Sequence, residues 1–129
     1  MLKTALGLVL IVLAVALLVW WWRPVTGPRQ VVVPTLSAEA EAGKVAFDRN
    51  CAACHGLSAA GSEKGPPLVE RTYHPGHHSD AAFELAVKRG VRAHHWLLGD
   101  MPPQPRVSRD EVARITRYVR ELQKANGVF

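Results

Sequence analysis

The chain of 129 residues has little of several things: two cysteines, two methionines and 7% aromatic residues. No window alternates apolar and polar residues over the length of a strand, so a β-sheet is not expected. A nucleophile motif, a catalytic carboxylate pair and a phosphate-binding loop are all missing, which argues against an enzyme. Charges of both signs are interspersed without an aromatic-rich basic stripe, which argues against nucleic-acid binding.

An uncharged run extends from Thr4 to Trp22. At roughly 1.5 Å per residue, a helix of this length crosses most of the hydrocarbon core of a bilayer. Three tryptophans end the run and suit a membrane interface, and Arg23 and Pro24 follow where a cleaved signal would have small residues. The sequence therefore predicts one uncleaved N-terminal transmembrane helix, a membrane anchor over residues 1–22.

The next segment, residues 23–36, contains Pro24, Gly27, Pro28 and Pro34. This composition resists helix formation and favours an extended tether. We therefore predict a proline-rich linker over residues 23–36 and a folded domain over residues 37–129.

The first of three helix signals in this domain begins at Ser37, which can cap a helix that ends near Asn50. Val45, Ala46 and Phe47 are expected to form its apolar face. This helix delivers the chain to the first cysteine.

A second helix is predicted over residues 80–89, capped by Ser79 and stopped by Gly90. Four apolar residues are expected on its buried side, namely Ala82, Phe83, Ala86 and Val87. A third helix begins at Ser108, which forms a capping box with Glu111. Its apolar positions recur at helical spacing, at Val112, Ile115, Val119 and Leu122. Together the three signals predict an all-α domain with long loops.

The cysteines occur in the motif CAACH, residues 51–55, which has the C-x-x-C-H form of a c-type haem attachment site. Thiols at this spacing can form thioethers to the two vinyl groups of one porphyrin, and the adjacent imidazole then meets the iron. The motif predicts one covalently bound haem c, attached through Cys51 and Cys54 and ligated by His55. Three other kinds of site also use C-x-x-C: a disulfide, a redox dithiol and a zinc site.

Met101, in the segment GDMPP, is the candidate for the second axial ligand of the iron. A thioether is soft and neutral, which favours ferrous iron and raises the potential. The only other methionine is Met1, ahead of the predicted anchor. The alternative ligands are His94 and His95, which would give a bis-histidine site of lower potential.

Taken together, residues 37–129 resemble the class I cytochrome c family, in which three main helices surround one haem. The resemblance implies that Gly43 and Phe47 in the first helix meet Tyr118 in the last. It also implies that the carbonyl of Pro66, in GPPL, accepts a hydrogen bond from His55, which orients the imidazole and raises its basicity.

The chain departs from the family pattern in two histidine-rich segments, YHPGHH at 73–78 and HHW at 94–96. His74, His77 and His78 could bind a transition metal, but loop histidines are commonly only solvated. The indole N–H of Trp96 is predicted to donate to a haem propionate, because a half-buried tryptophan normally has a hydrogen-bond partner.

These features predict an electron carrier rather than an enzyme, because an iron with both axial positions filled by protein transfers electrons without binding substrate. The resemblance to anchored cytochromes implies a quinol-oxidising complex or dehydrogenase as donor and an oxidase or reductase as acceptor. The single predicted anchor implies a single-pass protein of the cytoplasmic membrane. Covalent haem attachment in bacteria takes place outside the cytoplasm, which implies a periplasmic haem domain. Two alternatives stay open: a fixed subunit of a larger oxidoreductase, and a haem sensor with an open iron site.

Overall fold

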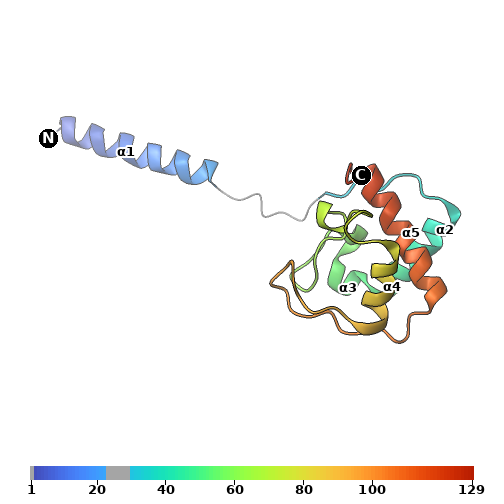
Figure 1. The fold of residues 1–129 in the computed structure, drawn as a ribbon. Coiled ribbons are helices and arrows are strands. Elements are labelled where there is room, and N and C mark those ends of the chain that lie inside the picture. Colours follow the sequence, from blue (N-terminus) through green and yellow to red (C-terminus); the bar gives the residue numbers. More distant parts are fainter. Residues whose placement is uncertain (1, 23–29) are drawn as a thin grey trace.

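A computed structural model describes residues 2–22 and 30–129 of the chain. The N-terminal run forms helix α1, Leu2–Trp21, ahead of the helical domain (Figure 1). The described apolar side chains of this helix are exposed, the tryptophans most of all. Among residues 2–22 and 30–129, no helix reaches the combined length and hydropathy that a bilayer crossing requires. The helix is present, and its role as a membrane anchor stays a prediction.

The predicted linker lies partly outside the described residues, at positions 23–29. Residues 30–37 contain no helix, in keeping with the proline-rich composition. They are nevertheless attached to the domain. The amide of Val32 donates to Asn126 Oδ1 at 2.9 Å, and Asn126 Nδ2 donates back to the Val32 carbonyl at 2.8 Å. Val31 and Leu36 pack against the core.

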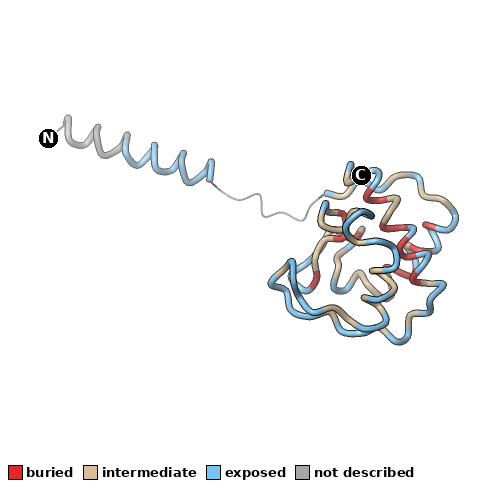
Figure 2. The backbone as a smooth tube through the Cα atoms, in the orientation of Figure 1, coloured by how far each residue is buried: buried red, intermediate tan, exposed pale blue. Residues whose placement is uncertain are grey.

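The core of the domain forms where helix α2, Ala38–Asn50, packs against helix α5, Arg109–Ala125 (Figures 1 and 2). Phe47 and Tyr118 are both fully buried, with ring centroids 5.6 Å apart and a tilt of 59°. Glycine at position 43 allows this crossing, because a Cβ there would run into the backbone carbonyl of Arg114. The contact implied by the family resemblance is therefore present.

Local capping signals fix both helix starts. The Ser37 side chain accepts a hydrogen bond from the Ala40 amide at 3.2 Å, and Ser108 and Glu111 form the predicted capping box. The predicted apolar face of α2 is wrong at Val45, whose side chain is 67% exposed. The predicted residues Ala46 and Phe47 are buried, and the small residues Ala40 and Gly43 complete the contact in place of Val45.

Helix α4, Asp80–Arg89, has the predicted bounds and packs against α5. Gly90 ends it with a φ of 74°, a conformation that glycine adopts without strain. Ser79 precedes the helix, but its side chain makes no capping hydrogen bond, contrary to the prediction. None of the helix residues is fully buried, including the four predicted on its buried side. Those four line a cavity instead.

The remaining elements are short. Helix α3, Ala52–His55, follows α2 directly, and two 3₁₀ turns, η1 (Leu57–Ala59) and η2 (Arg71–Tyr73), interrupt the loop after it. Among the described residues there is no strand, only an isolated antiparallel bridge between Val91 and Met101. The domain is therefore all-α, as predicted.

A polar network that the sequence analysis missed ties α5 to the loop before α4. Gln123 is fully buried and donates to the carbonyls of Leu68 and Tyr73 at 2.8 and 2.9 Å. The nearly buried Arg120 donates to the Tyr73 carbonyl at 2.7 Å and to Asp80 Oδ1 at 2.8 Å. Arg120 also donates to the carbonyl of His78, which fixes the histidine-rich loop to the helix.

Candidate haem site

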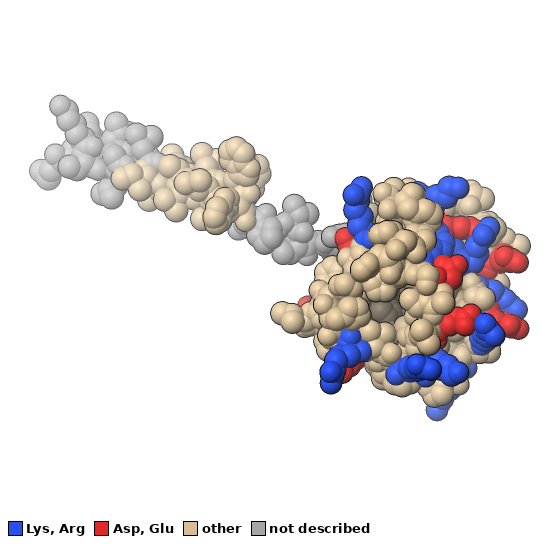
Figure 3. All heavy atoms as spheres, viewed as in Figure 1, with Lys and Arg blue, Asp and Glu red and all other residues tan. Residues whose placement is uncertain are grey.

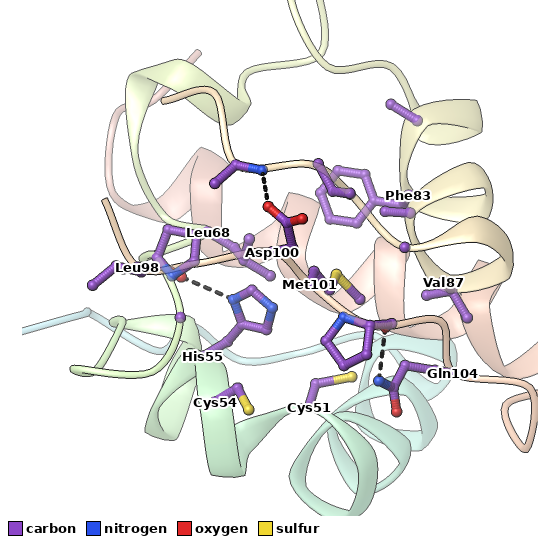
Figure 4. A pocket seen from close by; sticks show the side chains of 18 of the residues that line it. Cys51, Cys54, His55, Leu68, Phe83, Val87, Leu98, Asp100, Met101 and Gln104 are labelled. Atoms are coloured by element: carbon purple, nitrogen blue, oxygen red, sulfur yellow. Dashed lines mark hydrogen bonds between the residues drawn. The ribbon is translucent and has the colours of Figure 1, made fainter. Parts of the chain in front are cut away.

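A cavity of about 470 Å³ opens between α3, α4 and the loop that carries Met101 (Figure 4). Its walls are mainly apolar, with Leu68, Phe83, Val87 and Leu98 among the residues that line it. On the face of the domain shown in Figure 3, uncharged atoms cover the middle and charged side chains gather around the edge. An apolar cavity with few polar groups is typical of a cofactor site.

Both cysteines line this cavity because α2 ends at Asn50 and α3 begins immediately at Ala52. Their thiols are free, which removes the disulfide interpretation. Burial, with a smaller contribution from Cys54, raises the pKa of Cys51 to about 11. A redox dithiol needs a thiol whose pKa is lowered, so this environment does not suit one.

A zinc site at this motif lacks ligands. Within the described residues, no further histidine, cysteine or carboxylate joins Cys51, Cys54 and His55 to form a metal-binding group. A structural zinc ion needs four such ligands. The C-x-x-C spacing is compatible with four kinds of site. The burial and the neighbours of Cys51 and Cys54 suit haem attachment and not the other three.

His55 lies beside the cysteines, with Nδ1 2.9 Å from the carbonyl oxygen of Pro66. A carbonyl can only accept, so Nδ1 carries the proton and Nε2 keeps its lone pair free. Burial lowers the pKa of His55, against a smaller opposing effect of the Pro66 hydrogen bond, so the imidazole is neutral at pH 7. A neutral, oriented imidazole is what an iron ligand requires.

Met101 enters the cavity from a different segment, opposite the attachment helix (Figure 4). Two hydrogen bonds of 2.9 Å between the backbones of Val91 and Met101 fix its position. Gly90 allows this pairing, because a Cβ there would meet the Met101 carbonyl and lie 3.0 Å from Pro103 Cδ. The structure thus brings His55 and Met101 to one cavity from separate elements.

Trp96 also lines the cavity, and its indole nitrogen Nε1 is buried with no hydrogen-bond partner. Tyr73 lies nearby; burial raises the pKa of its hydroxyl, and the proximity of the Trp96 N–H partly offsets this. The two groups do not reach hydrogen-bond geometry, so the indole N–H stays available. A buried donor without a partner is costly, and an acceptor on a bound group would satisfy it.

The other histidines fall into an arrangement that the sequence did not indicate. His77 and His78 lie with His94 and His95, so that ring centroids of neighbouring members are 4.2 to 6.1 Å apart. His74, which the sequence analysis grouped with His77 and His78, instead accepts a hydrogen bond at Nδ1 from the Gly76 amide at 3.1 Å.

The comparisons with known proteins agree with this site. The family model for cytochrome c matches residues 40–123, most of the chain. Neither the search of curated proteins nor the search of solved structures gives a match.

Haem c, the covalently bound cofactor of this family, fits the residues present. The fit rests on two free thiols, a neutral imidazole, an apolar cavity and the unpartnered indole N–H of Trp96. The iron of haem c supplies one-electron chemistry between its ferric and ferrous states. The chain therefore belongs to the cytochrome c family and is a haem-binding, electron-transfer cytochrome.

Proposed function

We propose that this protein is a monohaem electron carrier whose iron is ligated by His55 and Met101. The observation that carries the proposal is the entry of both side chains into one cavity from different walls. In this proposal Cys51 and Cys54 would hold the porphyrin by thioethers. The sulfur ligand favours the ferrous state and so a higher potential, which suits a carrier.

Met101 is favoured over His94 and His95 as the second ligand because of how each is held. The backbone of Met101 is fixed at the base of its loop by the bridge to Val91. His94 and His95 are exposed residues farther along the same loop, where they contact the imidazole of His78. Either histidine would have to leave these contacts to reach an iron between His55 and Met101.

Two further residues would tune the site. The Pro66 carbonyl holds the proton on His55 Nδ1 and so increases the basicity of Nε2. The unpartnered N–H of Trp96 would donate to a propionate and satisfy a buried donor. Neither residue reacts; both position or polarise the cofactor.

The proposal includes a location at the cytoplasmic membrane, with the haem domain on the periplasmic side because covalent haem attachment in bacteria takes place there. The described side chains of α1 are exposed and apolar, and Trp20, Trp21 and the adjacent Trp22 suit a lipid interface. An anchor would raise the encounter rate with membrane partners by effective concentration. Those partners would be a quinol-oxidising complex or dehydrogenase as donor and an oxidase or reductase as acceptor. When cells are fractionated, the covalent haem of the full chain should sediment with membranes. A variant in which a cleavable export signal replaces residues 1–22 should carry its haem in the soluble fraction, and sedimentation of both would reject the anchor.

A redox titration of the haem-loaded full chain, with and without Met101→Ala, tests the ligand assignment. The unmodified protein should titrate as a one-electron couple, and Met101→Ala should lower the potential and let the reduced protein bind carbon monoxide rapidly. The control is His95→Ala, on the same loop, which should change neither property. A low potential in the unmodified protein that His95→Ala changes and Met101→Ala does not, with rapid carbon monoxide binding in His95→Ala, would assign the bis-histidine site. Rapid carbon monoxide binding by the unmodified protein would instead favour the sensor.

Purification separates the carrier from the other alternative, a fixed subunit of a larger oxidoreductase. A carrier should purify alone, whereas a fixed subunit should copurify with partners.

A further inference from the structure

In the proposed function the histidine cluster supplies no ligand to the iron, although His78, His94 and His95 also line the haem cavity. Three of the cluster's members, His77, His78 and His95, each place one ring nitrogen within 4.8 Å of a ring nitrogen of the other two. They come from two separate loops, one before α4 and one after it. We propose that these three histidines form a binding site for one divalent transition-metal ion, of the borderline class to which Zn²⁺ and Cu²⁺ belong.

The hydrogen bonds around His78 are those of a metal ligand. Its Nδ1 lies 2.7 Å from the carbonyl of Thr72, so Nδ1 carries the proton and Nε2 is free to coordinate. Histidines that bind metals almost always donate their other ring N–H to a carbonyl or carboxylate in this way. His94 repeats the arrangement, with Nδ1 2.8 Å from the Arg92 carbonyl. Its Nε2 is therefore free as well, but His94 lies outside the group of three, so water would supply the fourth ligand.

Both loops are held in place from behind, so the site is partly preorganised. Arg120 and the amides of His77 and His78 fix the first loop, the amides through hydrogen bonds of 3.0 and 2.9 Å to the His74 carbonyl. The second loop is closed by the Val91–Met101 bridge and by Asp100 Oδ1, which accepts from the Ala93 amide at 2.8 Å. A tetrahedral ion with bonds of about 2.0 Å to nitrogen needs ligand atoms roughly 3.3 Å apart. Side-chain rotation of exposed loop residues can supply the remaining movement.

The chemistry of the cluster selects the class of ion. Its ligands are imidazole nitrogens, which suit Zn²⁺ and Cu²⁺ and not Mg²⁺ or Ca²⁺, because the latter prefer oxygen. His77 and His95 are exposed, so an ion can enter directly from solvent.

His74 provides a matched control because it lies in the same loop, 6.2 Å from His77 between ring centroids, yet outside the group. Its Nδ1 is already used as an acceptor for the Gly76 amide. The substitution His74→Asn keeps an acceptor for that amide, as in an Asx turn, while removing an imidazole. The test variants are His77→Ala and His95→Ala, both at exposed positions.

The experiment is isothermal titration of Zn²⁺ into the tag-free, haem-loaded full chain, with Mg²⁺ as the control ion. We expect saturable 1:1 binding of Zn²⁺ and none of Mg²⁺. His77→Ala and His95→Ala should each weaken Zn²⁺ binding by more than about tenfold, the scale seen when even outer-shell contacts are removed. His74→Asn should keep the affinity within about twofold, since it removes no ligand.

Two outcomes would overturn the site: absence of saturable Zn²⁺ binding, or equal weakening by His74→Asn and His95→Ala. The haem absorption spectrum of each variant is recorded in parallel. It should not change, because these histidines are not assigned to the iron. Rapid carbon monoxide binding by the reduced His95→Ala variant, absent from the unmodified protein, would mean that His95 binds iron, and would reject the site on that ground.

Discussion

Replacing both cysteines, Cys51→Ala with Cys54→Ala, is expected to remove covalent haem completely and to leave the domain without a stable fold. Contacts between protein side chains alone bury little of the domain's apolar surface. The fully buried apolar residues come mainly from α2 and α5, and α4 has none. Its apolar face, including Phe83 and Val87, lines the cavity. Small domains of this kind need a staple such as a covalent cofactor.

Haem staining after denaturing electrophoresis measures attachment, and circular dichroism during urea unfolding measures the fold. The control is Val45→Ala, a change at an exposed position of the same helix α2, which should keep both haem and stability. A haem-free double variant that unfolds cooperatively at the same urea concentration as the unmodified protein would show that the cavity does not need its cofactor.

Arg120→Ala is expected to destabilise the domain by about 2 kcal/mol, the scale for leaving a buried polar group without its hydrogen-bond partner. Its side chain is 11% exposed and donates to Asp80, to Gln123 Oε1 and to the Tyr73 carbonyl at 2.7 to 2.8 Å. Its guanidinium also lies 4.9 Å from the ring centroid of Phe83. Removing it leaves the buried side chain of Gln123 with an unpaired oxygen.

Arg117→Ala is the matched control, because Arg117 is on the same helix but 57% exposed. Its ion pair with Glu121, at 2.9 Å, is of the i, i+4 surface kind and contributes less than about 0.5 kcal/mol. Urea unfolding of the two haem-loaded variants gives the difference in free energy of unfolding. Equal losses for the two would mean that the Arg120 network contributes no more than a surface pair.

Helix ends and the haem motif could be predicted from the sequence because their signals are local. Ser37, the Ser108–Glu111 box and Gly90 each act within a few residues, and all three mark helix ends in the structure. The face of α2 was harder to predict, since small residues make the contact and Val45 points elsewhere. The spacing of large apolar residues does not predict the contact face of α2, because α5 packs closely against Gly43, which has no side chain.

Long-range polar contacts could not be predicted in the same way. Gln123 gave one usable signal, because it lies four residues after Val119 and so falls within the apolar stripe of α5. The carbonyls to which it donates come from loops whose course no local pattern fixes. The histidine cluster is a similar case. His77 and His95 are separated by the whole of α4 and meet only because the loops on either side of that helix fold toward each other.

We propose that His55 and Met101 ligate the iron of a haem attached through Cys51 and Cys54. The optical spectrum of the oxidised, haem-loaded full chain tests this ligation through the far-red band that methionine sulfur gives on ferric haem. We expect the band to be present and Met101→Ala to abolish it. Absence of the band from the unmodified protein, or its survival in Met101→Ala, would show that Met101 does not ligate the iron.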